Sequence, residues 1–172
     1  MVRNRTGKIA AKFAREWVRD LKKVKRRRRG TPDARPTRNA SPARQASYRA
    51  RREADRQQRN GRVNGTAEAV TTADGRHTAV SVSDGPDKIY PHHREVARAL
   101  DSVPQNLRAP WHGNCALPQS LSKLLDRGID PRGGAIGAAR IRAPGNPGHG
   151  AHNPCCNSCK SLRNEFDLKE AL

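Results

Sequence analysis

The sequence predicts a small layered α/β domain that follows a basic helix and a disordered linker. Charge is the first observation: residues 1–62 hold 22 Lys and Arg against 5 Asp and Glu, whereas residues 63–172 hold 13 against 11. The second is the near absence of large apolar side chains from residues 31–64. The third is the order of elements expected after them, β-β-α-α-β-α. We therefore divide the chain into a basic amphipathic helix at 1–30, a disordered Arg-rich linker at 31–64 and a folded domain at 65–172.

The leader shows helical periodicity from Lys8 to Arg29, with Lys and Arg covering the faces that its apolar side chains leave free. Those apolar residues are Ile9, Phe13, Trp17, Leu21 and Val24. Such a segment can bind a polyanion, lie on an anionic membrane or dock on a delivery partner. It can equally be a solvated helix that joins the domain to something larger. The sequence leaves these alternatives open.

The segment from 31 to 64 contains Pro32, Pro36 and Pro42 together with many Arg, Ala, Gln and Asn residues. A chain of this composition buries too little apolar surface to offset the entropy lost on ordering. We expect disorder here, with a nascent helix over residues 43–58.

The folded domain begins with a hairpin, because Asp74-Gly75 suits a tight turn between two segments rich in β-branched residues. A helix follows Pro91, and another lies between Cys115 and Gly128 with a stripe of leucines on one side. The expected strands are 67–73, 77–83 and 135–142. The helix after Pro91 is expected at 91–101, and a third helix is expected at 156–166.

The sequence has no apolar run near the roughly 18 residues that a transmembrane helix needs. Its basic start is not followed by the apolar core and cleavage site of a secretory signal. We therefore expect a protein that is cytoplasmic or leaves its cell by a route without a signal peptide. Outside an oxidising compartment, clustered cysteines are more often metal ligands than disulfides.

The four cysteines lie in two groups with the spacing of a metal site. Cys156 and Cys159 are one turn apart at the start of a helix, where unpaired N–H groups and the helix dipole favour thiolates. Cys115 begins another helix, so two helix N-termini can point at one Zn²⁺ ion. Three protein ligands leave a fourth position for a water that the metal activates. Two alternative ligands remain open: His112, which would close a Cys₃His structural site, and Cys155.

This pattern is close to that of zinc-dependent nucleobase deaminases. Those enzymes carry a His or Cys ligand, a Glu two residues later, and then P-C-x-x-C. The Glu moves the proton while water attacks the amino-bearing carbon of cytosine or adenine. In this chain Leu117 stands at the Glu position, and no other carboxylate lies near the ligands in sequence.

The residues also carry a resemblance to a family. His112-Gly-x-Cys115-Ala-x-Pro118, Leu121-Ser-x-Leu124, His149-Gly150 and Cys156-x-x-Cys159 together resemble the YwqJ-like deaminases of the cytidine-deaminase-like superfamily, over roughly residues 65–168. The resemblance implies a layered deaminase fold, a zinc cofactor, and hydrolytic removal of an amine from a nucleobase or nucleic acid. It further implies the C-terminal module of a polymorphic toxin that acts in the target-cell cytoplasm, with an immunity protein as a partner.

Leu117 is the main departure from this family. Because acid–base assistance is worth ~10²–10⁴-fold, we expect impaired or absent deaminase activity. The alternative is a non-catalytic nucleic-acid-binding or interaction protein with a closed Cys₃His zinc site. Two further residues are candidates for substrate contact: His149, in the loop before the metal helix, and Trp111, which can stack on a base. A loop His is more often solvated or caps a helix, and Trp111 can equally be a core residue.

Overall fold

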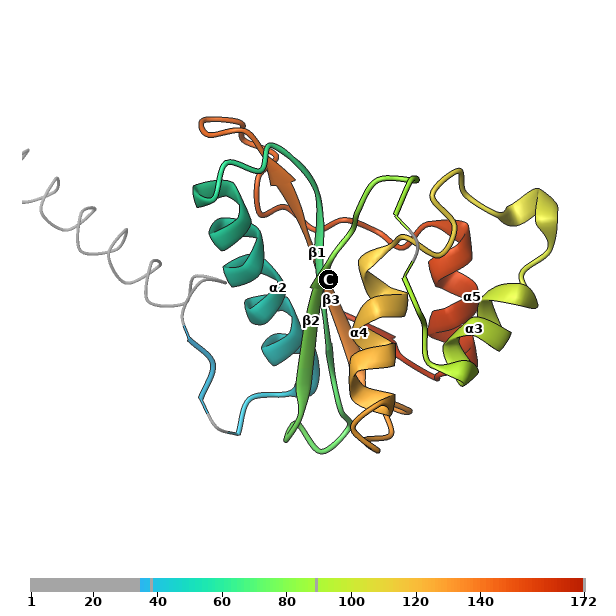
Figure 1. The fold of residues 1–172 in the computed structure, drawn as a ribbon. Coiled ribbons are helices and arrows are strands. Elements are labelled where there is room, and N and C mark those ends of the chain that lie inside the picture. The colour runs from blue at the N-terminus through green and yellow to red at the C-terminus, as the bar shows by residue number, and fades with distance from the viewer. Residues whose placement is uncertain (1–34, 38, 89, 172) are drawn as a thin grey trace, which may run out of the picture. The chain divides into compact units, whose positions relative to one another are not determined.

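The computed structural model of the chain describes residues 35–37, 39–88 and 90–171, so the basic helix expected at 1–30 lies outside the described residues. The described part holds four helices and a four-stranded sheet, which confirms the expected mixed α/β class. None of these helices has both the length and the apolar character needed to cross a membrane. In chain order the elements are α2 (Pro42–Arg59), β1 (Asn64–Thr71), β2 (Thr78–Val82), α3 (Arg94–Asp101), the 3₁₀ turn η1 (Gln105–Leu107), α4 (Ala116–Leu125), β3 (Ala135–Arg142), α5 (Asn157–Glu165) and β4 (Lys169–Glu170) (Figure 1).

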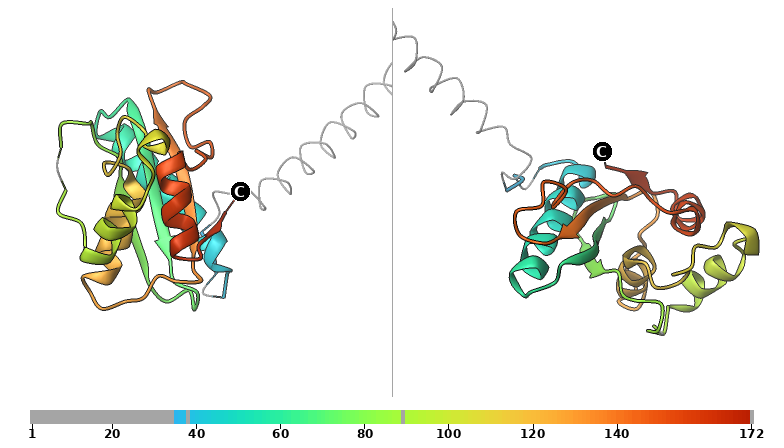
Figure 2. Two further views of the ribbon diagram at one scale, coloured as in Figure 1. Left: turned by 90° about the vertical axis from the view of Figure 1, so that its right-hand side faces the viewer. Right: turned by 90° about the horizontal axis from the view of Figure 1, so that it is seen from above.

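The strands form one sheet in the order β2-β1-β3-β4. β1 is antiparallel to β2 and to β3, whereas β3 and β4 are parallel and are connected through α5, as a parallel pair requires a crossover. The expected hairpin is confirmed, and Gly75 adopts the φ of +70° that its turn demands. Figures 1 and 2 show α2 on one face of the sheet and α3, α4 and α5 on the other.

Helix α2 corrects the expectation of a disordered linker. Its alanines Ala46, Ala50 and Ala54 recur every fourth position, are fully buried, and pack on small residues of β1 and β3. The approach is so close that a Cβ added to Gly137 of β3 would lie 2.3 Å from the backbone N of Ser47. The prediction of disorder over 31–64 is therefore wrong for Pro42–Arg59, because small side chains allow tight packing without large apolar groups. The helical tendency expected over 43–58 is confirmed, and the compact unit begins at Arg35 rather than near 65.

The main core lies on the opposite face of the sheet. The leucine stripe expected on α4 is confirmed, since Leu117, Leu121 and Leu124 are all fully buried. They belong to one cluster with Val70 and Ile136 of the sheet and with Leu162 and Phe166 at α5. This packing places the first turns of α4 and α5 in the same layer, which is what the cysteines require.

Candidate metal centre

Three cysteines converge where α4 and α5 begin. Cys115 is the N-cap residue of α4, Cys156 is the N-cap residue of α5, and Cys159 lies one turn further along α5. Their sulfur atoms all lie within 4.8 Å of one another, and the Sγ atoms of Cys115 and Cys156 are 3.6 Å apart. Cys115 and Cys159 are buried and Cys156 is half-buried. The convergence predicted from the spacing is confirmed, and the set could hold a metal ion.

The protonation of this cluster is uneven. Hydrogen bonds from the thiols of Cys115 and Cys159, together with the backbone N–H groups of Ser158 and Cys159 at the helix start, hold the pKa of Cys156 far below its usual value. The same thiolate raises the pKa of the Cys115 thiol. Hydrogen bonds to Cys115 and Cys156, followed by burial, raise the pKa of Cys159. Hydrogen bonding among the three sulfur atoms therefore couples their protonation, and a metal cation bound by them would displace the thiol protons.

Neither alternative ligand joins the three cysteines. The Nδ1 of His112 lies 2.9 Å from the hydroxyl of the buried Ser158, and the carbonyl of Leu100 acts on the imidazole as a hydrogen-bond partner. Cys155 is buried, and burial raises the pKa of its thiol. Its backbone N–H donates to the Oε1 of Glu170 at 3.3 Å. The described residues thus offer three ligands, one short of a tetrahedral set.

The structure adds a residue that sequence reasoning missed, Glu68 of β1. Its side chain is 5 % exposed, and its Oε2 has no hydrogen-bond partner among the described residues. Burial, and then the charge of Cys156, raise the pKa of this carboxyl to about 8, while the backbone N–H of Leu117 opposes the shift. Its negative charge in turn raises the pKa values of Cys115 and Cys159. A carboxyl therefore lies close to the cysteine cluster and to the backbone N–H of Leu117 in the first turn of α4.

Strand alternation explains where Glu68 points. Ala67 and Ala69 face α2, so the residue between them faces the layer of α4 and α5. The hydroxyl of Ser120 in α4 donates to the backbone carbonyl of Glu68 at 3.2 Å and fixes the helix against the strand. The register partner of Glu68 on β2 is Ser81, which is also buried and whose hydroxyl also lacks a partner among the described residues. One sequence signal could have revealed Glu68, namely a single charged residue at an inward position of an apolar strand.

Leu117 lies on the buried face of α4, as the leucine stripe in the sequence predicts. Its side chain is fully buried in the core, while its backbone N–H reaches the carboxyl of Glu68. The position that lacks a carboxylate in sequence is thus next to a carboxylate in space. The expectation that no other carboxylate lies near the ligands is therefore correct for distance along the sequence but not for distance in space.

The two candidate substrate contacts differ in their placement. Trp111 is 48 % exposed, and its backbone carbonyl lies 4.0 Å from the Sγ of Cys115, so the backbone of this exposed residue lies next to the cluster. His149 instead accepts from the backbone N–H of Arg142 at 3.2 Å through Nδ1, and its Nε2 lies 3.1 Å from Asp55 of α2. Both of its ring nitrogens have partners away from the cysteines, so the structure gives His149 a role in tying a loop to α2.

Only the geometry described above characterises this site. Compared with known proteins, the chain matches no family model, no curated protein and no solved structure.

Proposed function

We propose that this domain is a zinc-dependent hydrolase that removes the exocyclic amine of cytosine or adenine, with Glu68 as its proton carrier. Three features support the proposal: a three-cysteine cluster at two helix N-termini, a buried carboxyl beside it, and the order β2-β1-β3-β4 in a sheet covered on both faces. The resemblance to YwqJ-like deaminases leads to the same chemistry. The toxin role and the immunity partner that it implies are proposed on that resemblance alone.

The donor set fits zinc. Thiolates are soft ligands that favour zinc over magnesium or calcium, which take oxygen ligands. Cys115, Cys156 and Cys159 would hold the ion, and zinc with an open position lowers the pKa of water to about 7 and so supplies a nucleophile at neutral pH. His112, engaged with Ser158, gives little support to the closed Cys₃His alternative.

Glu68 supplies the proton movements that amine loss requires. As water adds to the amino-bearing carbon, its oxygen forms the new C–O bond and a proton passes to the carboxylate. The same carboxyl then protonates the departing nitrogen, so that the C–N bond breaks and ammonia leaves. Proton carriers work best when their pKa lies near the ambient pH, and the buried site raises the pKa of Glu68 toward that range.

The observation that carries the proposal is the free oxygen of Glu68. A buried carboxyl in a structural role is normally paired, because an unpaired one costs stability. Glu170 shows the structural case: its oxygens contact His152 at 3.2 Å and Arg163 at 2.8 Å and accept from the backbone N–H of Cys155. Glu68 has one carboxyl oxygen without a partner among the described residues and a raised pKa, and it lies beside potential metal ligands, so it has the character of a functional group.

Glu68→Gln tests this role. Gln has the same shape, but its amide cannot take up and release a proton at neutral pH. Ammonia release from cytosine or adenine substrates should therefore fall by ~10²–10⁴-fold. Zinc content, measured by metal analysis, should stay near one equivalent, because Glu68 is not among the sulfur ligands. Glu170→Gln is the control, since it removes a second carboxyl near the cluster and should keep most of the activity.

Two results would count against the proposal in different ways. Unchanged activity in Glu68→Gln would remove Glu68 from the reaction but leave a deaminase. A zinc-loaded wild-type chain that releases no ammonia from free bases, nucleosides, or single- and double-stranded nucleic acids would favour a purely structural metal.

A further inference from the structure

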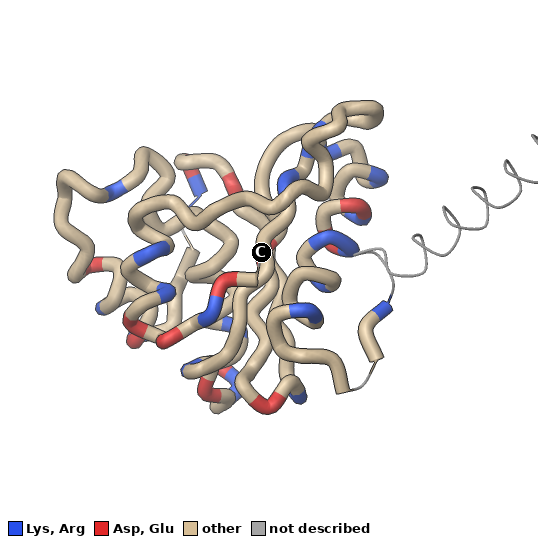
Figure 3. Tube along the Cα trace, turned by 180° about the vertical axis from the view of Figure 1, so that it is seen from behind, with Lys and Arg blue, Asp and Glu red and all other residues tan. Residues whose placement is uncertain are grey.

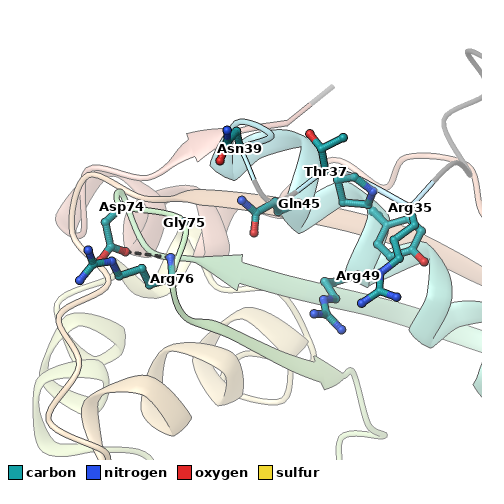
Figure 4. Close-up of a pocket in the computed structure, with 10 residues that line it drawn as sticks. Arg35, Thr37, Asn39, Gln45, Arg49, Asp74, Gly75 and Arg76 are labelled. Carbon is teal, nitrogen blue, oxygen red and sulfur yellow. Dashed lines mark hydrogen bonds and ion pairs between the residues drawn. The ribbon is translucent and has the colours of Figure 1, made fainter.

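An arginine-lined groove lies at the other end of the described unit from the cysteines. It is formed by residues 35–37 and 39, the first half of α2, and the turn between β1 and β2, and its main hollow measures about 960 Å³ (Figure 4). A smaller hollow of about 320 Å³ continues it toward Arg127, just beyond the C-terminal end of α4, and shares Arg49 and Arg76 with it. Cys115 of the cluster caps the N-terminal end of α4, a helix ~15 Å long at 1.5 Å per residue.

The groove is cationic and its arginines are largely unneutralised. Arg35, Arg49 and Arg127 form no ion pair with any residue that the structure describes. Figure 4 shows the guanidinium groups of Arg35 and Arg49 turned the same way, with Arg76 beside Asp74. Asp74 is the one carboxylate lining the main hollow, and it already accepts from the hydroxyl of Thr72 and the backbone N–H of Arg76. The lining therefore carries a net positive charge.

The groove is a built feature rather than a chance gap. The side chain of Gln45 donates to the carbonyl of Ala40 at 2.8 Å and so holds the segment before α2 in place. Gln45 also contacts the turn, since a Cβ at Gly75 would lie 2.9 Å from its Nε2. Further exposed arginines continue along α2 at Arg44, Arg52 and Arg59, and Figure 3 shows arginine positions in blue along that helix, with acidic positions in red among them. The positive surface thus extends from the groove along the helix.

We propose that this groove binds the phosphodiester backbone of a nucleic acid. Arginine presents a planar fork of donors that matches phosphate oxygens, and the exposed Thr37 and Asn39 add neutral donors of the kind that also contact phosphates. A protein partner would be expected to find an apolar anchor, but the exposed large apolar residues of the described part, Val63, Leu107 and Trp111, all lie outside the groove. The inference does not depend on the metal centre.

The test compares two charge-matched double variants of the full chain. Arg35→Gln with Arg49→Gln removes two unpaired arginines of the groove, and Arg94→Gln with Arg98→Gln removes two exposed arginines of α3 on the other face of the sheet. The probe is a fluorescein-labelled 20-nucleotide oligothymidylate, titrated at several salt concentrations. Each lost phosphate contact lowers the slope of log affinity against log salt by ~0.7 for a single strand, so the groove variant should lose ~1.4. The α3 variant should keep the wild-type slope.

Every outcome decides the question, because the leader is present in all three proteins and its contribution cancels. Equal slopes in the wild type and the groove variant would overturn the proposal, as would an equal loss in the α3 variant, which indicates general charge attraction. Poly-glutamate of similar length is the last arm. If it competes as well as the unlabelled oligonucleotide, and loses binding in the same variant, the groove recognises acidic polymers at large and the phosphodiester assignment fails.

Discussion

Glu68 is a costly residue for a small domain, since it places a titratable group in a core made mainly of leucine, valine and alanine. Its carboxyl meets the backbone N–H of Leu117, and that same residue buries its side chain away in the leucine stripe. The backbone of Leu117 therefore binds the carboxyl of Glu68, while its side chain packs in the core.

This division of roles predicts the effect of restoring the carboxylate at position 117. Leu117→Glu should lower the melting temperature, because it buries a second ionisable group in a packed core, and it should not raise ammonia release above that of the wild type. Leu117→Met, which is close in volume, should cost less than ~1.5 kcal/mol and keep the activity. A sharp gain of activity in Leu117→Glu would show that Glu68 does not fill the proton carrier's place.

At the level of elements, local sequence patterns located most of the fold. The strand at 135–142, the hairpin around Asp74-Gly75 and the α4 stripe are set by neighbouring residues, and all are confirmed. The cysteine cluster was predictable for the same reason, since its ligands lie on first turns of two helices. The sequence could mark Glu68 as an inward-facing charged residue, but it could not show the proximity of Glu68 to Cys156, which depends on how β1 packs under α4. Helix α2 was missed because its stabilising contacts are between alanines and backbone.

The α2 interface gives a sharp prediction at β3. Gly137→Ala adds one methyl group that would collide with the backbone of Ala46 and Ser47, at 2.3 to 2.6 Å, so the helix must shift. Overpacking of this kind typically costs 1–3 kcal/mol, and we expect at least ~2 kcal/mol from chemical denaturation. Gly85→Ala is the control, because a Cβ there meets nothing within 4 Å and the residue has no positive φ. Equal stability of the two variants would mean that α2 does not rest on β3.

At the level of the whole molecule, the compact unit spans Arg35–Leu172, with helices on both faces of a single sheet. The candidate metal centre and the arginine groove lie at opposite ends of α4. A nucleic acid bound in the groove would therefore be held at a distance from the cysteines, and the two sites can be altered separately.

Truncation tests these limits of the folded unit. A chain from residue 35 to 172 should melt cooperatively, because the compact unit makes its contacts within itself. A chain from 65 to 172 should lose cooperative unfolding or aggregate, since it exposes Ala67, Ala69 and Ile141 on the face that α2 covers. Circular dichroism melts of both fragments measure this. Equal melting midpoints for the two fragments would show that the domain folds without α2.

The alanine packing of α2 also has a consequence for motion. A buried alanine removes much less apolar surface from water than a leucine, so each buried alanine of α2 gains less from burial than each buried leucine of α4. The free energy needed to detach α2 locally should then lie below that of global unfolding. In native-state hydrogen exchange, amides of α2 should exchange sooner than those of β1 and β3. Each such opening would separate Arg49 from Arg76 and take the groove apart while the cysteines stay in place.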